Sequence, residues 1–259
     1  AALQSDGLRL HFQPQVDVAA PNAIVGFEAL LRWPDSGSPQ IAPSTFVPVA
    51  EQTGLIVPIG LWALRQACLQ AVEWQRRGYP PARMAVNVAA AQFARPDFVA
   101  SVRRVLDETG LDASLLELEV TEGSVMRDIE EVTTRLNELR ELGVTIAVDD
   151  FGTGYSSLAY LNRLPFDALK VDRSFVRSLA GREAGGDHVL VGAIVQLGRN
   201  LNKIVIAEGI ETVEQLDRLR GLGCDVGQGY LFARPISAED ATRLLGRGSP
   251  DDVLRVGAR

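Results

Sequence analysis

Short apolar runs alternate along the chain with amphipathic stretches, and several of these stretches end at a glycine. The apolar runs predict strands near residues 8–16, 24–33, 83–88, 115–120, 144–149, 167–172, 203–208 and 225–231. The amphipathic stretches predict helices that include residues 59–78, 129–143 and 212–223. Strands that alternate with helices in this way, over 259 residues, are typical of a (β/α)8 barrel.

The first two predicted strands depart from this alternation. Only a short connection around residues 21–23 separates them, and it is too short for a crossover helix. We therefore expect the two strands to pair antiparallel. The predicted fold class is α/β, a TIM-like (β/α)8 barrel with the first strand antiparallel to the rest. We find no linker or low-complexity tract, so residues 1–259 are interpreted as one domain.

Polar residues interrupt strands that should be almost entirely apolar in a parallel barrel. They are Glu28, Arg32, Asn87, Glu119, Asp149, Lys170, Asp172 and Glu208. Apart from Glu28, they fall late in their strands, and active sites of such barrels are built at the carboxyl ends of the strands. The sequence therefore predicts that polar side chains from at least six strands converge on one mouth.

Composition and charge narrow the possible partners. A net charge of −7 argues against a DNA or RNA duplex bound through a basic face. The two cysteines, Cys68 and Cys224, fit no metal or redox spacing. Neither a signal peptide nor a membrane span is expected in this segment, so we predict a cytoplasmic location and no membrane contact by it.

The acidic residues at the predicted mouth suggest a metal site. A single acid at a strand end is more often a helix cap or a solvated charge, but several together repel one another unless a cation is present. The two histidines, His11 and His188, lie outside the set, which makes zinc improbable, whereas oxygen ligands suit Mg²⁺ or Mn²⁺. Adjacent Asp149 and Asp150 could serve two cations, one of them bridging.

Eight motifs then resemble a known family. They are FQPQVD, GFEALLRW, AVNVA, LELEVTE, DDFGTGYSSL, LKVDRSF, IAEGIET and GCDVGQGYLFARP. In this order, from about Leu8 to Pro235, they resemble the EAL-domain cyclic di-GMP phosphodiesterases. The resemblance implies a barrel with one strand reversed and metal-dependent hydrolysis of cyclic di-GMP to linear pGpG. It also implies a homodimer, and a segment of a longer signalling protein with other signalling domains.

The resemblance further implies a role for individual residues. The cation ligands, for two Mg²⁺ or Mn²⁺ ions, would be Glu28, Asn87, Glu119, Asp149 and Asp150. Lys170 would lie beside the attacking water, Glu208 would act as ligand or general base, and Glu122 would steady the DDFGTG loop. The substrate-contacting residues would be Gln13, Arg32 and Gln228. The chain has Ala89 and Gly123 where the family commonly has serine. For Glu117, we expect a structural ion pair.

Two other functions stay open on the sequence. A receptor module could bind cyclic di-GMP without turnover, although a pure receptor would not need the whole set of metal ligands. A Schiff-base aldolase could use Lys170, but crowding by acids would keep this lysine protonated.

Overall fold

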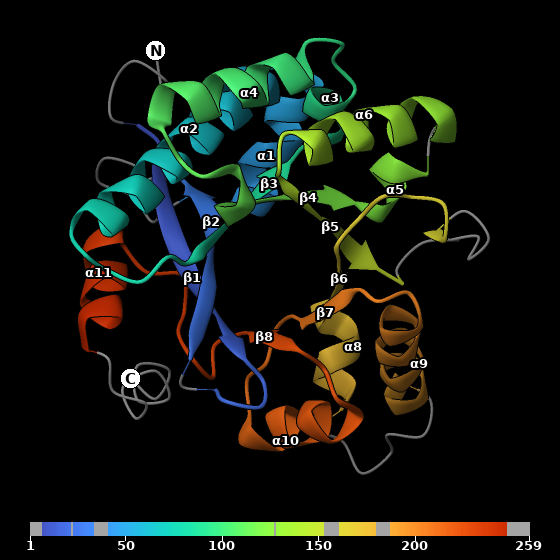
Figure 1. The fold of residues 1–259 in the computed structure, drawn as a ribbon. Coiled ribbons are helices and arrows are strands. Elements are labelled where there is room, and N and C mark those ends of the chain that lie inside the picture. Colours follow the sequence, from blue (N-terminus) through green and yellow to red (C-terminus); the bar gives the residue numbers. More distant parts are fainter. Residues whose placement is uncertain are drawn as a thin grey trace.

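The computed structural model describes residues 7–21, 23–33, 41–126, 128–152, 161–179 and 187–247. Within them, eight strands close into a barrel in sequence order, and the helices surround it (Figure 1). The strands are β1 (Arg9–Asp17), β2 (Ile24–Arg32), β3 (Arg83–Val88), β4 (Leu116–Thr121), β5 (Thr145–Phe151), β6 (Ala168–Val171), β7 (Ile204–Ala207) and β8 (Val226–Gln228). The predicted TIM-like fold is therefore confirmed.

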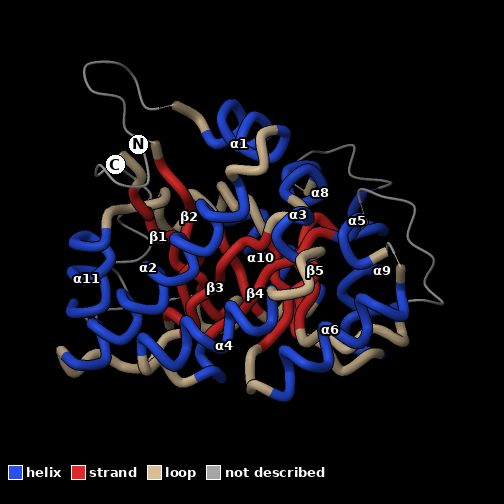
Figure 2. Tube along the Cα trace, turned by 90° about the horizontal axis from the view of Figure 1, so that it is seen from above, coloured by secondary structure: helices blue, strands red, loops and turns tan. Residues whose placement is uncertain are grey.

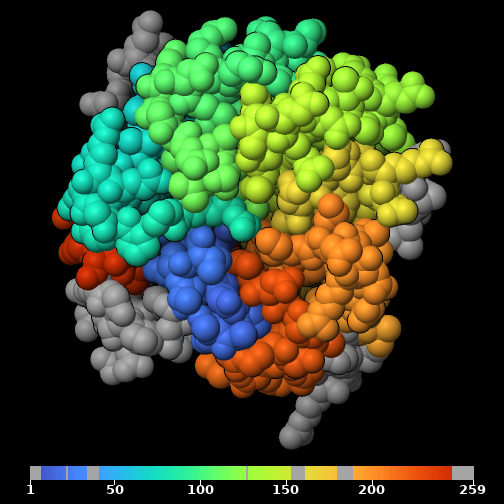
Figure 3. Space-filling view, in the orientation of Figure 1, coloured from blue at the N-terminus to red at the C-terminus, as the bar shows by residue number. Residues whose placement is uncertain are grey.

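The helices follow the strands in the order expected of successive strand–helix units. They are α1 (Pro43–Gln52), α2 (Ile56–Arg76), α3 (Ala90–Phe93), α4 (Phe98–Thr109), η1 (Ala113–Leu115), α5 (Glu122–Val125), α6 (Ile129–Glu141), α8 (Arg173–Ser178), α9 (Asp187–Asn200), α10 (Val213–Leu222) and α11 (Ala238–Arg247). In the space-filling view, the sequence colours run around the molecule in the same order (Figure 3). Among the described residues, no helix is both long and apolar enough to span a membrane.

Strand β1 runs antiparallel to both of its neighbours, β2 and β8, as the short first connection predicts. All other neighbouring strands pair parallel. The register places Gln13 opposite Glu28 and Asn87 opposite Glu119. Because side chains alternate between the two faces of a strand, each of these pairs brings polar side chains of two neighbouring strands side by side, whereas Glu28 lies opposite Ala85 on β3.

The main core lies between the barrel and its helices. The strands lie inside and the helices lie around them (Figure 2). On α2, Trp74 packs against Phe12 and Phe27, with ring centroids 5.3 and 5.0 Å apart. The Trp74 Nε1–H also donates to Thr242 Oγ1 at 2.8 Å, which attaches α11 to the same helix. Aromatic packing with a satisfied indole N–H fixes α2 against the reversed strand pair.

Two strands end two or more residues away from the predicted positions, and the other strand ends differ by at most one residue. The last strand stops at Gln228 instead of residue 231, because a Cβ at Gly229 would lie 2.1 Å from the Ile210 carbonyl oxygen. This close approach turns the chain out of the sheet. Strand β5 instead continues past residue 149 to Phe151, with an irregular register between Val148 and Phe151.

The predicted helix ends are close to those of the structure and have physical causes. Helix α10 begins after Thr212, whose hydroxyl accepts the Gln215 N–H in a capping box. It ends at Gly223, which has a φ of 79°. This left-handed conformation favours glycine and stops the helix where the sequence predicts.

Candidate functional site

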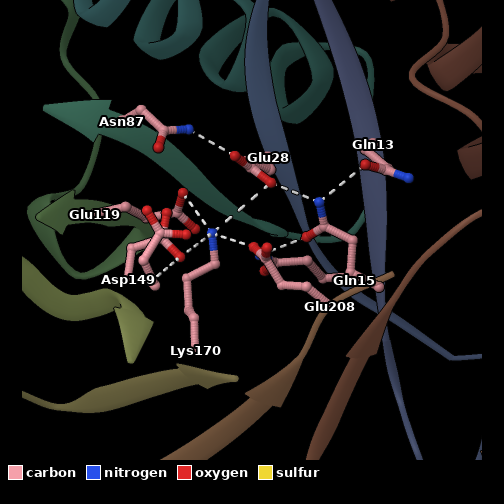
Figure 4. A network of polar contacts seen from close by, with 10 residues as sticks. Gln13, Gln15, Glu28, Asn87, Glu119, Asp149, Lys170 and Glu208 are labelled. Atoms are coloured by element: carbon pink, nitrogen blue, oxygen red, sulfur yellow. Dashed lines mark hydrogen bonds and ion pairs between the residues drawn. The ribbon is translucent and has the colours of Figure 1, made fainter. Parts of the chain in front are cut away.

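Lys170 lies at the centre of the polar cluster inside the barrel mouth (Figure 4). Its side chain is fully buried, and its ammonium lies among carboxylates from four different strands or strand ends. The distances from Lys170 Nζ are 2.6 Å to Glu208 Oε1, 2.8 Å to Glu119 Oε2, 3.5 Å to Asp149 Oδ1 and 3.9 Å to Glu28 Oε2. One positive charge therefore faces four acids.

Glu28 connects this cluster to the antiparallel strands. Asn87 Nδ2 donates to Glu28 Oε1 at 2.6 Å, and Gln228 Nε2 donates to Glu28 Oε2 at 2.5 Å. Gln228 Nε2 also lies within hydrogen-bonding distance, 3.0 Å, of Gln13 Oε1. Hence residues of β1, β2, β3 and β8 that the sequence assigned to metal and substrate form one network.

Asp149 and Asp150 point in different directions at the irregular end of β5. Asp150 has a φ of 55°, and its N–H donates to Asp149 Oδ1 at 2.8 Å. Asp149 faces Lys170 at ion-pair distance, whereas Asp150 is exposed. Partial burial raises the pKa of Asp150, and the charge of Asp149 adds to the rise. The left-handed residue separates two carboxylates that a regular strand would also have placed on opposite faces.

The charges inside the cluster shift the pKa of its members in opposite directions. Burial acts to lower the pKa of Lys170, but the four surrounding carboxylates raise it well above its usual value. Burial raises the pKa of Glu119 well above its usual value, and the charge of Glu28 adds to this. Burial also raises the pKa of Glu208, to about 8, although Lys170 opposes it. The positive charge of Lys170 is thus too small to stabilise all four neighbouring acids as carboxylates.

Glu28 has a lowered pKa in the same surroundings. Burial acts to raise it, but Lys170 and the hydrogen bonds from Gln228 and Asn87 together outweigh burial. The network therefore keeps Glu28 as a carboxylate, which is the form that binds cations.

The donor set of the cluster fits a hard divalent cation. Both Glu119 carboxylate oxygens are buried and have no aligned hydrogen-bond partner, although Lys170 lies at ion-pair distance. Such orphaned oxygens are rare in folded proteins unless an ion or water satisfies them. Among the described residues, no group of three or more His, Cys, Asp or Glu side chains is arranged so that it could hold a metal ion. Instead, the Lys170 ammonium lies between the carboxylates.

Other predicted site residues lie around this cluster. The Gly152 N–H donates to Glu122 Oε2 at 2.9 Å, so Glu122 contacts the first glycine of the DDFGTG loop. The rest of that loop and its sequel, residues 153–160, lie outside the described residues. Arg32 is partly buried, and its Nη1 donates to the Leu31 carbonyl oxygen at 2.7 Å. Asp172, expected at the mouth, instead caps α8 by accepting the Ser174 N–H.

Glu117 forms the predicted ion pair. Arg83 Nη1 lies 3.0 Å from Glu117 Oε2, and Glu117 is fully buried. Burial raises the pKa of Glu117, although Arg83 opposes the rise. Glu117 precedes Glu119 by two residues on β4 and shares its face, so the ion pair lies one layer below Glu119.

Some residues at the site were missed by the sequence reasoning. Gln15 is buried, and its Nε2 donates to Gln228 Oε1 at 3.2 Å. Its alternation with Gln13 on one strand was a usable signal. Arg173 and Tyr230 line the mouth beside Asp149 and Glu208. They lie after the ends of β6 and β8, where strand alternation gives no information about direction.

Two cavities flank the cluster and meet at Glu28 and Leu30. The first has a volume of about 230 Å³ and is lined by acids, glutamines and the two missed residues: Gln13, Glu28, Asp149, Arg173, Glu208, Glu211, Gln228 and Tyr230. The second has a volume of about 350 Å³ and is lined mainly by apolar side chains. A ligand centred over Glu28 could therefore extend in two directions.

Comparison with known proteins agrees with this geometry. The model of the EAL domain family matches residues 1–235. The chain belongs to the EAL domain family. This match includes every strand of the barrel and all the residues of the Lys170 cluster.

Several EAL domain proteins are similar over nearly the whole chain. The bifunctional diguanylate cyclase/cyclic di-GMP phosphodiesterase MucR of Pseudomonas aeruginosa is 48% identical over 92% of this chain and 34% of its own length. The cyclic di-GMP phosphodiesterase NbdA of the same organism is 43% identical over 91% of this chain and 30% of its own length. This EAL domain chain therefore spans about a third of the length of these two relatives.

A solved EAL domain structure also has the same fold. The PaMucR phosphodiesterase in its c-di-GMP complex superposes with a TM-score of 0.88 at 48% identity, covering 93% of this chain and 96% of that one. The barrel with one antiparallel strand is thus the fold of a protein solved with a cyclic dinucleotide.

Proposed function

We propose that this chain is a divalent-metal-dependent phosphodiesterase that hydrolyses cyclic di-GMP to linear pGpG. The observation that carries the proposal is the surplus of buried acid, since Lys170 faces four carboxylates. A surplus of buried like charge is unfavourable unless a further cation binds. The names of the MucR and NbdA relatives support cyclic di-GMP as the substrate.

The cation ligands in this proposal are Glu28, Asn87, Glu119, Asp149 and Asp150, for two Mg²⁺ or Mn²⁺ ions. Their oxygen donors suit these metals. When bound, such ions lower the pKa of water and stabilise charge at the phosphorus. Asp149 faces the cluster and Asp150 leaves it, which supports different roles for the two neighbours.

In the reaction, a water oxygen forms a bond to phosphorus and the bond from phosphorus to the ribose 3′-oxygen breaks. The released 3′-oxygen takes up a proton, and the new phosphate stays at the 5′ end of pGpG. Lys170 remains a cation that orients the water and stabilises charge on the phosphate. Glu208, 2.6 Å from Lys170 Nζ, assists removal of the water proton.

The substrate contacts in this proposal come from Gln13, Gln228 and Arg32. Gln13 and Gln228 line the acid cavity, and Arg32 lines the apolar one. A guanidinium suits a phosphate oxygen of the dinucleotide. Glu122 holds the start of the DDFGTG loop through the Gly152 N–H. Through this loop, homodimer formation would position Asp149 and Asp150; this coupling, the cytoplasmic location and the further signalling domains stay predictions.

The alternatives make different demands on the same residues. A Schiff-base aldolase needs a neutral lysine, whereas the carboxylates raise the pKa of Lys170 well above its usual value. A receptor of cyclic di-GMP would bind the dinucleotide and leave it intact. The receptor is therefore the alternative that the decisive experiment must separate.

That experiment measures cyclic di-GMP turnover with Mg²⁺, with Mn²⁺, with Ca²⁺ and after chelation. We expect pGpG with Mg²⁺ or Mn²⁺ and no product in excess chelator. Ca²⁺, which is larger and less strict in geometry, should permit binding with poor turnover. Undiminished activity in chelator would refute the metal dependence, and tight binding without product under both Mg²⁺ and Mn²⁺ would identify a receptor.

A further inference from the structure

The apolar cavity beside Glu28 has the dimensions and walls of a small-ligand site. Its volume of about 350 Å³ lies within the roughly 300–1,000 Å³ that is usual for such sites. The aliphatic part of its wall comes mainly from β2, α1, α2 and β3, and includes Leu30, Leu31, Val47, Ile56, Ala63, Val86 and Val88. Asn87 and Glu28, members of the polar cluster, line it as well. A ligand in this cavity would thus be in contact with the proposed metal ligands.

One polar side-chain atom in this wall has no hydrogen-bond partner among the described residues. Gln92, on α3, is 4% exposed, and its Oε1 is buried without a hydrogen bond. Leaving a buried polar group unsatisfied costs about 1–3 kcal/mol. Folding alone does not favour an amide at this position, because an apolar side chain of similar volume would avoid this cost.

A glycine in the facing helix makes room for this amide. Gly60 lies inside α2, where glycine is less favourable than alanine by roughly 0.5–1 kcal/mol. A Cβ at Gly60 would lie 2.1 Å from Gln92 Oε1, closer than any contact allows. Gly60 and Gln92 also line the same cavity. Two locally unfavourable residues therefore combine to hold, at a cavity wall, an amide whose oxygen has no partner in the described part of the chain.

We propose that Gln92, in the space left by Gly60, recognises one guanine base of the cyclic dinucleotide. This inference rests on the proposed function. A flat heterocycle fits between aliphatic side chains, and an amide presents an acceptor and a donor side by side, matching the N1–H and O6 of guanine. Each base of a cyclic dinucleotide lies to one side of its phosphates. With a phosphate over Glu28, one base reaches the Gln92 cavity and the other base faces the acid-lined one.

The first test replaces Gln92 by methionine, which keeps the volume and removes both hydrogen bonds. The matched control is Gln70→Met, in a surface groove between α2 and α11. We expect Gln92→Met to raise KM for cyclic di-GMP about tenfold or more and to change kcat less than about threefold, since the base contact is the same in substrate and transition state. The same rise should appear in the dissociation constant measured with Ca²⁺.

The melting temperature separates recognition from a structural role. Gln92→Met should melt at or above the wild-type temperature, because it removes an unsatisfied buried amide. A lowered melting temperature with unchanged KM would show that Gln92 is structural and would overturn the inference.

A second test uses Gly60→Ala in two backgrounds. In the wild type, the added methyl group should displace the Gln92 amide and raise KM. The helix propensity of α2 should increase at the same time, because alanine is a better helix former than glycine. In a Gln92→Ala background, the same change should leave KM unaltered, so the two effects are not additive. An equal rise of KM in both backgrounds would mean that the methyl group fills the cavity without acting through Gln92.

The wild-type protein distinguishes failure of this inference from failure of the proposed function. If it neither cleaves nor binds cyclic di-GMP, the proposed function fails and the inference fails with it. If it does both, and Gln92→Met behaves as Gln70→Met does, the inference alone is wrong.

Discussion

Two buried ion clusters lie in successive layers of the same barrel, and their charge balance differs. In the lower layer, Arg83 faces one buried acid, Glu117, at 3.0 Å. In the upper layer, Lys170 faces four carboxylates. The pair needs no further charge, although Glu117 Oε1 has no hydrogen-bond partner among the described residues. The upper layer has more acid than base, so it must take up protons, as the raised pKa of Glu119 and of Glu208 indicates, or bind a cation. The comparison separates a structural ion pair from a site that is incomplete without a ligand.

The largest expected effect is on turnover when an acid is removed from the upper layer. Glu28→Ala should reduce cyclic di-GMP turnover by a factor of about a thousand or more, equivalent to about 4 kcal/mol of transition-state stabilisation. Without metal, the same change should leave the protein folded, because the relief of repulsion among the acids offsets part of the loss of the hydrogen bonds from Asn87 and Gln228 to Glu28.

Turnover at saturating Mn²⁺ and melting in chelator together test this prediction. Asp107→Ala, the removal of an exposed acid on α4, provides a comparison for nonspecific loss of charge. Near wild-type turnover by Glu28→Ala would mean that the site has been assigned wrongly.

The next effect concerns Lys170, the cation that the described residues place in the upper layer. Lys170→Met leaves the acids without a counter-charge, and removal of one partner from a buried ion cluster typically costs about 3–5 kcal/mol. We expect this loss of stability in chelator, measured by denaturant unfolding. Added Mn²⁺ should restore more stability to Lys170→Met than to the wild type, because the metal supplies the missing positive charge.

An equal gain in stability from Mn²⁺ in both proteins would show that metal and Lys170 do not compensate the same charges. Turnover of Lys170→Met should stay low even with metal, because the donor that orients the water is absent.

The sequence predicted the barrel because periodicity and connection length are local properties. The short connection at residues 21–23 was sufficient to reverse β1, and late polar residues such as Asn87 and Glu119 marked the mouth. The ion pair of Glu117 was predicted as well, and Glu117 and Glu119 lie two residues apart on β4, so they share one face. These features follow from side-chain direction in a strand.

Other features depend on contacts between distant segments and could not be predicted. The end of β8 at Gln228 follows from the close approach of Ile210 to Gly229. The mouth positions of Arg173 and Tyr230 depend on how the chain turns after a strand. The Gln92 amide lies on α3, and the glycine that leaves room for it, Gly60, lies on α2. No local pattern contains such information.

A smaller effect is the pH dependence of stability in the chelated protein. The pKa of Glu208 is raised from 4.5 to about 8, so the folded protein binds this proton more tightly than the unfolded chain. The stability that this protonated carboxyl contributes to the fold is fully present below pH 4.5 and is lost as the pH rises towards 8. Over this range, the free energy of unfolding should fall by up to about 1.4 kcal/mol per pH unit for this one proton.

Glu208→Gln should remove this part of the slope, as measured by urea unfolding at several pH values in chelator. The raised pKa of Glu119 acts in the same direction, so a reduced slope remains in the variant. If Glu208→Gln had the wild-type slope, Glu208 would ionise freely in the folded protein and would not be held protonated by burial.

The smallest effect on turnover is expected from the lower layer. Arg83→Met leaves the fully buried Glu117 without its partner, which should reduce stability by about 3–5 kcal/mol, or by less if Glu117 becomes protonated. Turnover per folded molecule should change by less than about threefold, because neither residue belongs to the proposed ligand set.

Combining Arg83→Met with Glu117→Leu should recover most of the stability, since a buried ion pair can often be replaced by apolar side chains. Unfolding curves and turnover of the single and double variants give both readouts. A loss of turnover comparable to that of Glu28→Ala in a fully folded double variant would show that the two layers act as one charge cluster, and the distinction between them would be wrong.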